Sequence, residues 1–248
     1  MASTSIEELR ELLDKLTILP DIAAQDIAVA RLLTCERTQV LSFLNQHALN
    51  LATEDAAYAR SLLSADMLLR DGVGIEMALR AIGRDPGENA SGTDFIPRLL
   101  RRAGDRPIAL FGTRSPWLDY ANAAICAQGG RVVRAIDGFQ PQSRYIAATL
   151  AHDPAIVLLG LGMPRQEVLA ARLAALPGQR LIINGGAILD FYAGRFMRAP
   201  RWLRSARLEW AFRLAQEPRR LSGRYIAGGH RFALTVARMR QHMDGPRS

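Results

Sequence analysis

The middle of the chain carries four short apolar runs in which polar and apolar positions do not alternate. Strands that are buried on both faces have this pattern, and parallel sheets are built from such strands. Each run closes on a glycine-containing turn, and helical patterns such as 116–130 and 164–178 lie between the runs. Strands that alternate with helices predict a doubly wound, Rossmann-like α/β fold with a parallel sheet. The four runs are residues 108–113, 131–138, 155–162 and 180–187.

The first part of the chain adds helices and two further strands to this picture. Ser5 and Glu8 have the spacing of a capping box, which predicts a first helix that ends before Pro20. Residues 37–55 mix the periods of strand and helix, so we expect a helix, a strand and a helix there. Residues 65–74 predict a strand that leads into an Asp-Gly loop and then a helix.

The alternation of strands and helices stops near residue 194, and the remainder predicts a separate helical appendage. We therefore divide the chain into an α/β core, residues 1–194, and a C-terminal amphipathic appendage, residues 195–248. Pro218 is expected to end one helix of the appendage, and Gly223 or the pair 228–229 to bend the next.

A helix that starts at Pro200 would place an apolar stripe on one face and arginines beside it. Helices that lie in a membrane interface have this composition, with tryptophan at the lipid boundary and arginine near lipid phosphates. An apolar stripe that packs against the α/β core is the alternative. The stripe consists of Trp202, Ala206, Trp210 and Leu214, and the arginines beside it are Arg201, Arg204 and Arg207.

The positive charge of the chain is concentrated in the appendage. The formal net charge is +8, and residues 195–248 hold 13 arginines against 3 acidic residues, so that residues 1–194 sum to −2. This asymmetry indicates an anionic partner at the C-terminal end: nucleic acid, membrane lipid or a phosphorylated ligand.

Membrane spans, disulfides and zinc sites are not indicated by the sequence. No apolar run is long enough to cross a bilayer, and residues 1–21 are charged rather than typical of a signal peptide, so we expect a protein on the cytoplasmic side. Cys35 and Cys126 lie far apart without metal-ligand spacing, and we expect both to be small buried side chains.

Glycines at the ends of the predicted strands are candidates for binding phosphate. Ligands of open parallel sheets lie beyond the carboxyl ends of the strands, where backbone N–H groups are available. Each glycine is also explained by a tight turn, and neither the dinucleotide fingerprint GxGxxG nor the P-loop pattern occurs. The candidates are Gly112, Gly160, Gly162, Gly185 and Gly186.

Three polar residues at strand ends and helix starts are further candidates. Asp71, at the tip of a predicted strand, suits a general base, although an Asp that only stabilises its own turn fits the same spacing. Gln166 and Glu167 fall in the first turn of a helix and are candidate substrate-binding residues, since Gln can bind a base or sugar, although complementing the helix dipole is enough to explain Glu. The four histidines form no catalytic pattern.

Five segments of the chain, taken together, resemble the WecG/TagA/CpsF family of bacterial glycosyltransferases. The resemblance covers roughly residues 45–225, and its most specific part is the RAPxW…EWxxRLxxEPxR signature. It implies transfer of a hexose-type sugar, with inversion, from a UDP-sugar to a polyprenyl-diphosphate-linked sugar at the cytoplasmic membrane face, in the synthesis of cell-surface polysaccharide or exopolysaccharide. The segments are "DGVG" (71–74), "GTDF" (92–95), "GLGMPRQE" (160–167), "NGGAILDFYAGRFMRAPRWLR" (184–204) and "LEWAFRLAQEPRRLSGRY" (208–225).

The resemblance also implies roles for individual residues. Asp71 matches the general base and Asn45 an active-site asparagine, while Arg213, Arg220 and Arg224 match arginines that reach over the diphosphate. Phe43 stands where the family has Thr, which leaves the identity of the sugar open. No Asp-x-Asp pair is present to hold a divalent metal. We therefore expect no metal cofactor, with arginines and helix N-termini supplying the positive charge at the diphosphate.

Two other functions are compatible with parts of the sequence. The basic appendage suits a nucleic-acid-binding protein, but the tryptophans on one helical face and the negative charge of the core disfavour it. A Rossmann-like oxidoreductase is disfavoured by the missing fingerprint. We therefore expect a UDP-sugar, a lipid-linked acceptor and an anionic membrane surface as partners, without nucleic acid. The acceptor glycan, the linkage, the pathway and the oligomeric state stay open.

Overall fold

The computed structural model describes residues 4–34 and 36–244. Its described strands form one sheet, and all of their pairings are parallel, in the order β2-β1-β6-β5-β3-β4. The doubly wound α/β fold predicted from the sequence is thereby confirmed. The strands are β1 (Gln39–Leu44), β2 (Met67–Arg70), β3 (Pro107–Gly112), β4 (Arg131–Ile136), β5 (Ile156–Gly160) and β6 (Leu181–Asn184).

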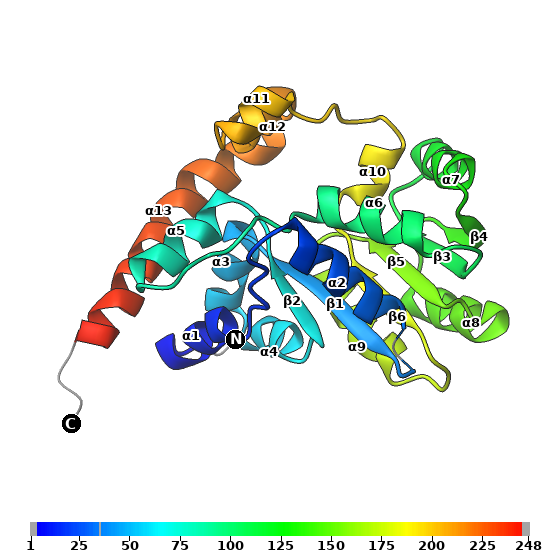
Figure 1. Ribbon diagram of the computed structural model, residues 1–248, viewed down its shortest axis with the longest axis horizontal. Helices are drawn as coiled ribbons and strands as arrows, with labels where there is room; N and C mark the ends of the chain where they lie inside the picture. The colour runs from blue at the N-terminus through cyan, green and yellow to red at the C-terminus, as the bar shows by residue number, and fades with distance from the viewer. Residues whose placement is uncertain (1–3, 35, 245–248) are drawn as a thin grey trace.

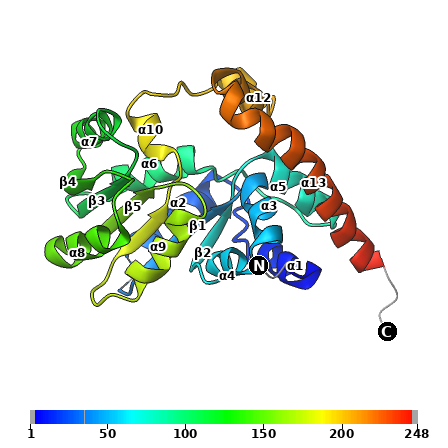
Figure 2. The same cartoon turned by 180° about the vertical axis from the view of Figure 1, so that it is seen from behind.

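Helices cover both faces of this sheet (Figures 1 and 2). The helices before β3 are α1 (Ile6–Asp14), α2 (Ile22–Leu33), α3 (Gln46–Glu54), α4 (Ala56–Leu63), α5 (Val73–Ala81) and α6 (Gly92–Arg102). Those after β3 are α7 (Trp117–Ala127), α8 (Gln142–His152), α9 (Arg165–Ala174), α10 (Ile188–Tyr192), α11 (Arg201–Ser205), α12 (Glu209–Gln216) and α13 (Pro218–Asp244).

The core is divided by the alternation of side chains along the strands. In β5, Ile156 and Leu158 belong to a cluster with α2, α6, α7 and α10, whereas Val157 and Leu159 belong to one with α8 and α9. Since successive residues of a strand point to opposite faces, uninterrupted apolar runs are what a sheet covered on both sides requires. A third cluster joins α1, α3, α4 and α5 to α13 beside β2.

Several local predictions are confirmed and others are wrong. The capping box of Ser5 and Glu8 is present at α1. Within 37–55 there is no helix before the strand, because α2 ends at Leu33 and β1 starts at Gln39. The run at 131–138 was expected to be buried on both faces, but β4 is an edge strand with exposed positions. Cys126 is exposed rather than buried, and Cys35 lies outside the described residues.

The appendage differs most from its prediction. The expected single helix from Pro200 is two short helices, α11 and α12, separated at Arg207, whose φ is +62°. Pro218 does mark the end of one helix and opens α13, but α13 then continues through Gly223 and the pair 228–229 to Asp244. Phe232 and Met239 of α13 are buried in the third cluster. The predicted division after residue 194 falls between α10 and α11, and it stays a prediction.

None of the helices in the described residues is both long enough and apolar enough to cross a membrane.

Candidate active site

A cleft of about 360 Å³ lies along the carboxyl edge of the sheet. Every strand contributes to its lining with the residues at or directly after its carboxyl end, which is where ligands of open parallel sheets bind. The strand order places β2 and β1 at one end of the cleft and β3 and β4 at the other. The six contributions are Asn45 (β1), Asp71 (β2), Thr113 (β3), Gly138 (β4), Gly160 (β5) and Gly185 (β6).

Asp71 and Asn45 are neighbours because their strands are. Leu44 of β1 is in register with Arg70 of β2, and the N–H of Asp71 donates to the carbonyl of Leu44 at 2.9 Å. The side chain of Asn45 caps α3, where its Oδ1 accepts from the N–H of Ala48 at 3.0 Å. This bond fixes the orientation of the amide, and Asn45 also makes a side-chain hydrogen bond to Asp71. The amide therefore holds the carboxylate from one side.

The environment of Asp71 raises the pKa of its carboxyl group to about 6. Burial is the main cause, because it disfavours the charged form, and the negative charge of Glu209 adds to it. The positive charge of Arg213 and the hydrogen bond of Asn45 act in the opposite direction. A carboxyl group with a pKa near the working pH, in a cleft, has the properties of a general base.

The five candidate glycines serve different purposes. Gly112 is outside the cleft lining, and a Cβ there would lie 2.5 Å from the carbonyl oxygen of Gly160, so close packing of β3 on β5 explains it. Gly160 and Gly185 line the cleft but also pack closely on α10 side chains. Gly162 and Gly186 have φ values of +75° and +58°, with open space where a Cβ would be. These two therefore leave the backbone accessible to a ligand.

Gln166 and Glu167 lie beneath the cleft and are not among the residues that line it. Gln166 is fully buried, its Oε1 accepts from the N–H of Gly186 at 3.0 Å, and its Nε2 donates to Glu167 at 2.9 Å. Burial raises the pKa of Glu167 to about 7, against the bond from Gln166. The pair thus supports the loop at Gly186 from below.

The far end of the cleft holds residues that sequence reasoning did not single out. The hydroxyl of Thr113 donates to Asp190 at 2.8 Å, and Arg195 pairs with the same carboxylate at 3.1 Å. The ring of Phe139 is 68% exposed, and the guanidiniums of Arg114 and Arg165 each lie 5.9 Å from its centroid. The signals for this region were the glycine-containing ends of the runs at 108–113 and 131–138 and the family segment 184–204, which contains Asp190 and Arg195.

The predicted arginines of the appendage are placed only in part. Arg213 lines the cleft, with its guanidinium 5.1 Å from the ring of Phe191 on α10. Arg220 and Arg224 lie on α13, but their side chains are outside the described part of the structure. His47, for which no role was predicted, also lines the cleft near Asn45.

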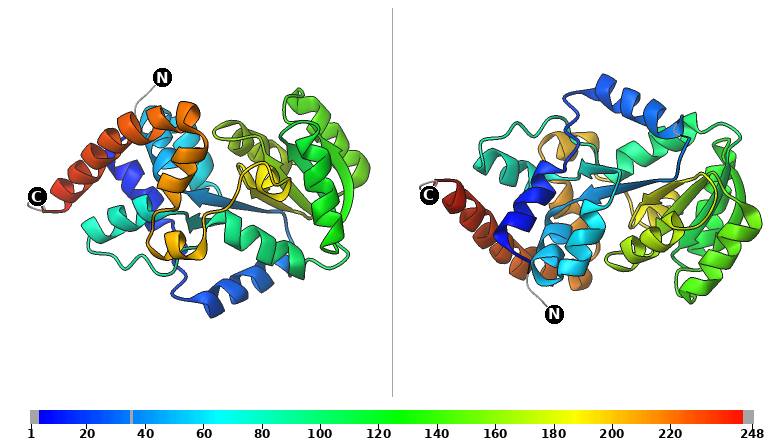
Figure 3. Two further views of the ribbon diagram at one scale, coloured as in Figure 1. Left: turned by 90° about the horizontal axis from the view of Figure 1, so that it is seen from above. Right: turned by 90° about the horizontal axis from the view of Figure 1, so that it is seen from below.

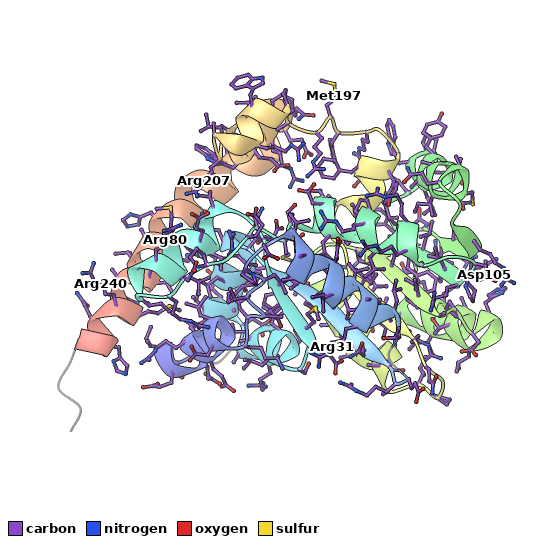
Figure 4. All side chains as sticks on the ribbon, in the orientation of Figure 1. Arg31, Arg80, Asp105, Met197, Arg207 and Arg240 are labelled. Atoms are coloured by element: carbon purple, nitrogen blue, oxygen red, sulfur yellow. The ribbon has the colours of Figure 1, made fainter. Side chains whose placement is uncertain are left out.

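Two core carboxylates bind the arginines that flank the predicted apolar stripe. Asp94 pairs with Arg198 and, at 3.6 Å, with Arg204, and buried Glu76 pairs with Arg207 at 2.6 Å. Figure 4 labels Arg207 beside the upper part of α13 and Arg80 on α5 below it, and Arg80 pairs with Glu76 at 3.2 Å. Arg204 and Arg207 therefore bind carboxylates of the protein, and their predicted contact with lipid phosphates stays a prediction. The side chain of Arg201 lies outside the described part of the structure.

The two tryptophans of the predicted stripe are exposed instead. Trp202 is 68% exposed and Trp210 41% exposed. The alternative in which the stripe packs on the α/β core is therefore wrong for these two residues. No group of three His, Cys, Asp or Glu residues in the described ranges is arranged to hold a metal ion.

Comparison with known proteins shows two similarities that bear on function. Residues 19–245 match the model of the glycosyl transferase WecG/TagA/CpsF family. The chain is also 28% identical over 179 residues to an N-acetylglucosaminyldiphosphoundecaprenol N-acetyl-beta-D-mannosaminyltransferase of Bacillus spizizenii, and the match covers 68% of each chain. Neither match supports the nucleic-acid-binding alternative.

Proposed function

The chain belongs to the WecG/TagA/CpsF family of glycosyl transferases, and from this premise we propose that it transfers a hexose-type sugar from a UDP-sugar to a polyprenyl-diphosphate-linked saccharide. The name of the Bacillus relative, which describes a glycosyl diphosphoundecaprenol acceptor, supports the lipid-linked substrate. We place the reaction in the synthesis of a cell-surface polysaccharide or exopolysaccharide.

Asp71 is the proposed general base. Its carboxylate removes the proton from an acceptor hydroxyl as that oxygen attacks the anomeric carbon of the donor, and the bond from this carbon to UDP breaks. A single displacement on the face opposite the leaving group inverts the anomeric configuration. Asn45 orients the carboxylate through the hydrogen bond described above. The observation that carries the proposal is that Asp71 lines the same cleft as Gly160, Gly162 and Gly186.

The donor is proposed to lie along the carboxyl edge of the sheet, with its sugar near Asp71. Its diphosphate then lies by the open backbone at Gly162 and Gly186, next to the N-terminus of α9. The nucleobase of the donor is directed to the far end of the cleft, where the exposed ring of Phe139 offers a stacking surface. Gln166 and Glu167 act here by positioning the Gly186 loop.

Negative charge develops on UDP as it leaves, and Arg213, one of the described arginines that line the cleft, is placed to offset it. We assign Arg220 and Arg224 to the same task, because guanidiniums bind diphosphates in bidentate fashion. The sequence has no Asp-x-Asp pair that could hold a divalent ion against the diphosphate, so we propose catalysis without a metal cofactor.

The exposed apolar residues of the appendage support a peripheral position on the membrane. Trp202, Leu208 and Trp210 are between 40% and 68% exposed, and tryptophan is enriched where protein meets the lipid headgroups. A lipid-linked acceptor requires such a position. We propose the cytoplasmic face of the membrane, where UDP-sugars are available.

A donor screen tests this function. Purified protein is incubated with a synthetic lipid-diphosphate-sugar acceptor and a panel of UDP-sugars, and products are identified by mass. We expect one donor to add a single hexose-type unit. Asp71→Asn should abolish transfer and keep UDP binding in calorimetry. If no UDP-sugar is transferred to any such acceptor, or if Asp71→Asn keeps full activity, the proposed reaction or its base is wrong.

A further inference from the structure

A group of aromatic side chains lies on the side of the cleft opposite the appendage. Trp117 opens α7 just beyond the carboxyl end of β3, and its ring packs edge to face on Tyr120 at 5.9 Å. Tyr120 is 54% exposed. Neither residue lines the cleft, and neither has a part in the proposed reaction. An aromatic pair at this edge of the sheet therefore needs another explanation.

The chain between α10 and α11 connects this pair to the appendage. The guanidinium of Arg195 lies 5.6 Å from the ring of Trp117 and 5.3 Å from that of Phe196. The next residue, Met197, is 70% exposed, and its backbone N–H and carbonyl both bond to Gln216 of α12 at 3.0 Å. Figure 4 shows Met197 at the outer edge of this segment, pointing away from the sheet.

A set of exposed or partly exposed apolar side chains therefore extends over α7, residues 196–197, α11 and α12. We call it the aromatic rim and define it as Trp117, Tyr120, Phe196, Met197, Trp202 and Trp210. Seen from above, α7 lies on one side of α10 and the appendage on the other (left panel of Figure 3). The aromatic rim thus has two sides, one on each lip of the cleft.

The charges around the rim favour a lipid surface as its partner. Arg195 lies within the rim, where it pairs with Asp190 of the cleft, and Arg114 lies in the cleft wall directly before α7. One carboxylate, Asp119, is on the exposed first turn of α7, where it accepts a hydrogen bond from the hydroxyl of Ser115. Tryptophan, tyrosine and arginine together are the residues that proteins place at the level of lipid headgroups.

We propose that α7 and residues 195–197 form a second membrane contact, so that both lips of the cleft touch the bilayer and its mouth opens onto the lipid surface. The inference rests on the proposed function, because a lipid-linked acceptor is what such a mouth would admit. Contacts on both lips hold the enzyme in one orientation. The acceptor diphosphate can then enter the cleft while its prenyl chain stays in the membrane.

The three tryptophans of the chain make the test direct, because Trp202 and Trp210 lie on one lip and Trp117 on the other. Two single-tryptophan chains, one that keeps Trp117 and one that keeps Trp202, are made by replacing the other two with Phe. Each is mixed with phosphatidylcholine–phosphatidylglycerol vesicles that carry brominated acyl chains. We expect the bromines to quench Trp117 to within about twofold of the quenching of Trp202.

A matched control uses Leu150, which is 52% exposed near the end of α8, at the opposite edge of the sheet. Leu150→Trp in a tryptophan-free chain should show no quenching. Tyr120→Ser should lower vesicle binding at least threefold and leave transfer to a short, water-soluble acceptor analogue unchanged. That second readout separates membrane contact from catalysis.

Each other outcome has a defined meaning. If Trp202 is quenched and Trp117 is not, the contact at α7 is overturned and the proposed transferase stands. If neither is quenched, both membrane contacts are overturned, and activity on the soluble analogue still reports the proposed function separately. A concentration-dependent dimer that Tyr120→Ser abolishes, with Trp117 unquenched, would assign this face to a second copy of the chain and overturn the proposal.

Discussion

Replacement of Asp71 by Asn should stabilise the fold while it abolishes catalysis. The carboxyl group of Asp71 has a pKa of about 6 in the folded protein, against 3.8 without the surrounding structure. Between these two pH values the unfolded chain has lost the proton that the folded protein still holds. The free energy of unfolding therefore falls as the pH rises through this window, and the loss is complete above pH 6.

The size of the effect follows from the two pKa values. A pKa difference of about 2 corresponds to about 3 kcal/mol at pH 7. The attraction of Arg213 and the hydrogen bond from Asn45 are already contained in the pKa of about 6, since both oppose the effect of burial. The amide introduced by Asp71→Asn would keep an acceptor for Asn45 and would carry no charge to desolvate. The substitution should therefore raise the free energy of unfolding by at most about 3 kcal/mol, which corresponds to an increase in Tm on the order of 5–10 °C for a chain of this length.

Urea denaturation of both proteins at pH 3.5 and at pH 7.5 measures this directly. At pH 7.5 we expect the free energy of unfolding of the variant to exceed that of the parent by about 1–3 kcal/mol. At pH 3.5 we expect the two values to be almost equal. Asp105→Asn is the matched control, because Asp105 is exposed (Figure 4) and its replacement should be neutral at both pH values. Equal or lower stability of Asp71→Asn at pH 7.5 would show that Asp71 is not an ion desolvated in the cleft.

Three further results are expected. The value of kcat/KM for the acceptor should fall about tenfold per pH unit below pH 6, because the base must be ionised. Arg213→Gln should move the midpoint of this profile to higher pH, because the positive charge of Arg213 lowers the pKa of Asp71. A flat profile from pH 5 to 8 would contradict the role of Asp71. Gln166→Leu should weaken UDP binding about tenfold in calorimetry, since the N–H of Gly186 loses its acceptor, whereas unchanged binding would separate this loop from the donor. Asp94→Asn should speed hydrogen exchange in residues 198–208 up to about fivefold by removing the partner of two arginines, and an unchanged rate would mean that other contacts hold α11 and α12.

Most of the α/β core could be predicted because its signals are local. Apolar runs between helical patterns identify strands, and the four runs between 108 and 187 all became strands of the sheet. The order of the strands is not local, since β1 pairs with β6 across more than a hundred residues. The sequence therefore placed Asp71 at a strand end, and the family resemblance pointed to Asn45, but only the pairing of β1 with β2 brings them together.

Residues of the candidate site could be predicted where they lie directly at the end of a strand, but not where their contacts depend on the tertiary structure. Gln166 and Glu167 were expected to contact a ligand because they open a helix after a glycine-rich loop. The structure instead turns both side chains under the loop, and Gln166 bonds to a backbone N–H twenty residues further on. Thr113, Asp190 and Phe139 had no signal of their own, because each gains its importance from neighbours that the topology supplies.

The orientation of the appendage could not be predicted from its sequence pattern, for a different reason. An amphipathic pattern states that a helix has two faces but not which face meets the protein. Here Asp94 and Glu76, two carboxylates of the core, bind Arg198, Arg204 and Arg207, which lie more than a hundred residues further along the chain. Exposing Trp202 and Trp210 forgoes about 2 kcal/mol of burial for each side chain. The ion pairs offset little of this, because partly exposed pairs contribute about 0–1 kcal/mol. Coverage by another apolar surface would recover the remaining free energy, and the membrane contact proposed above would be such a surface.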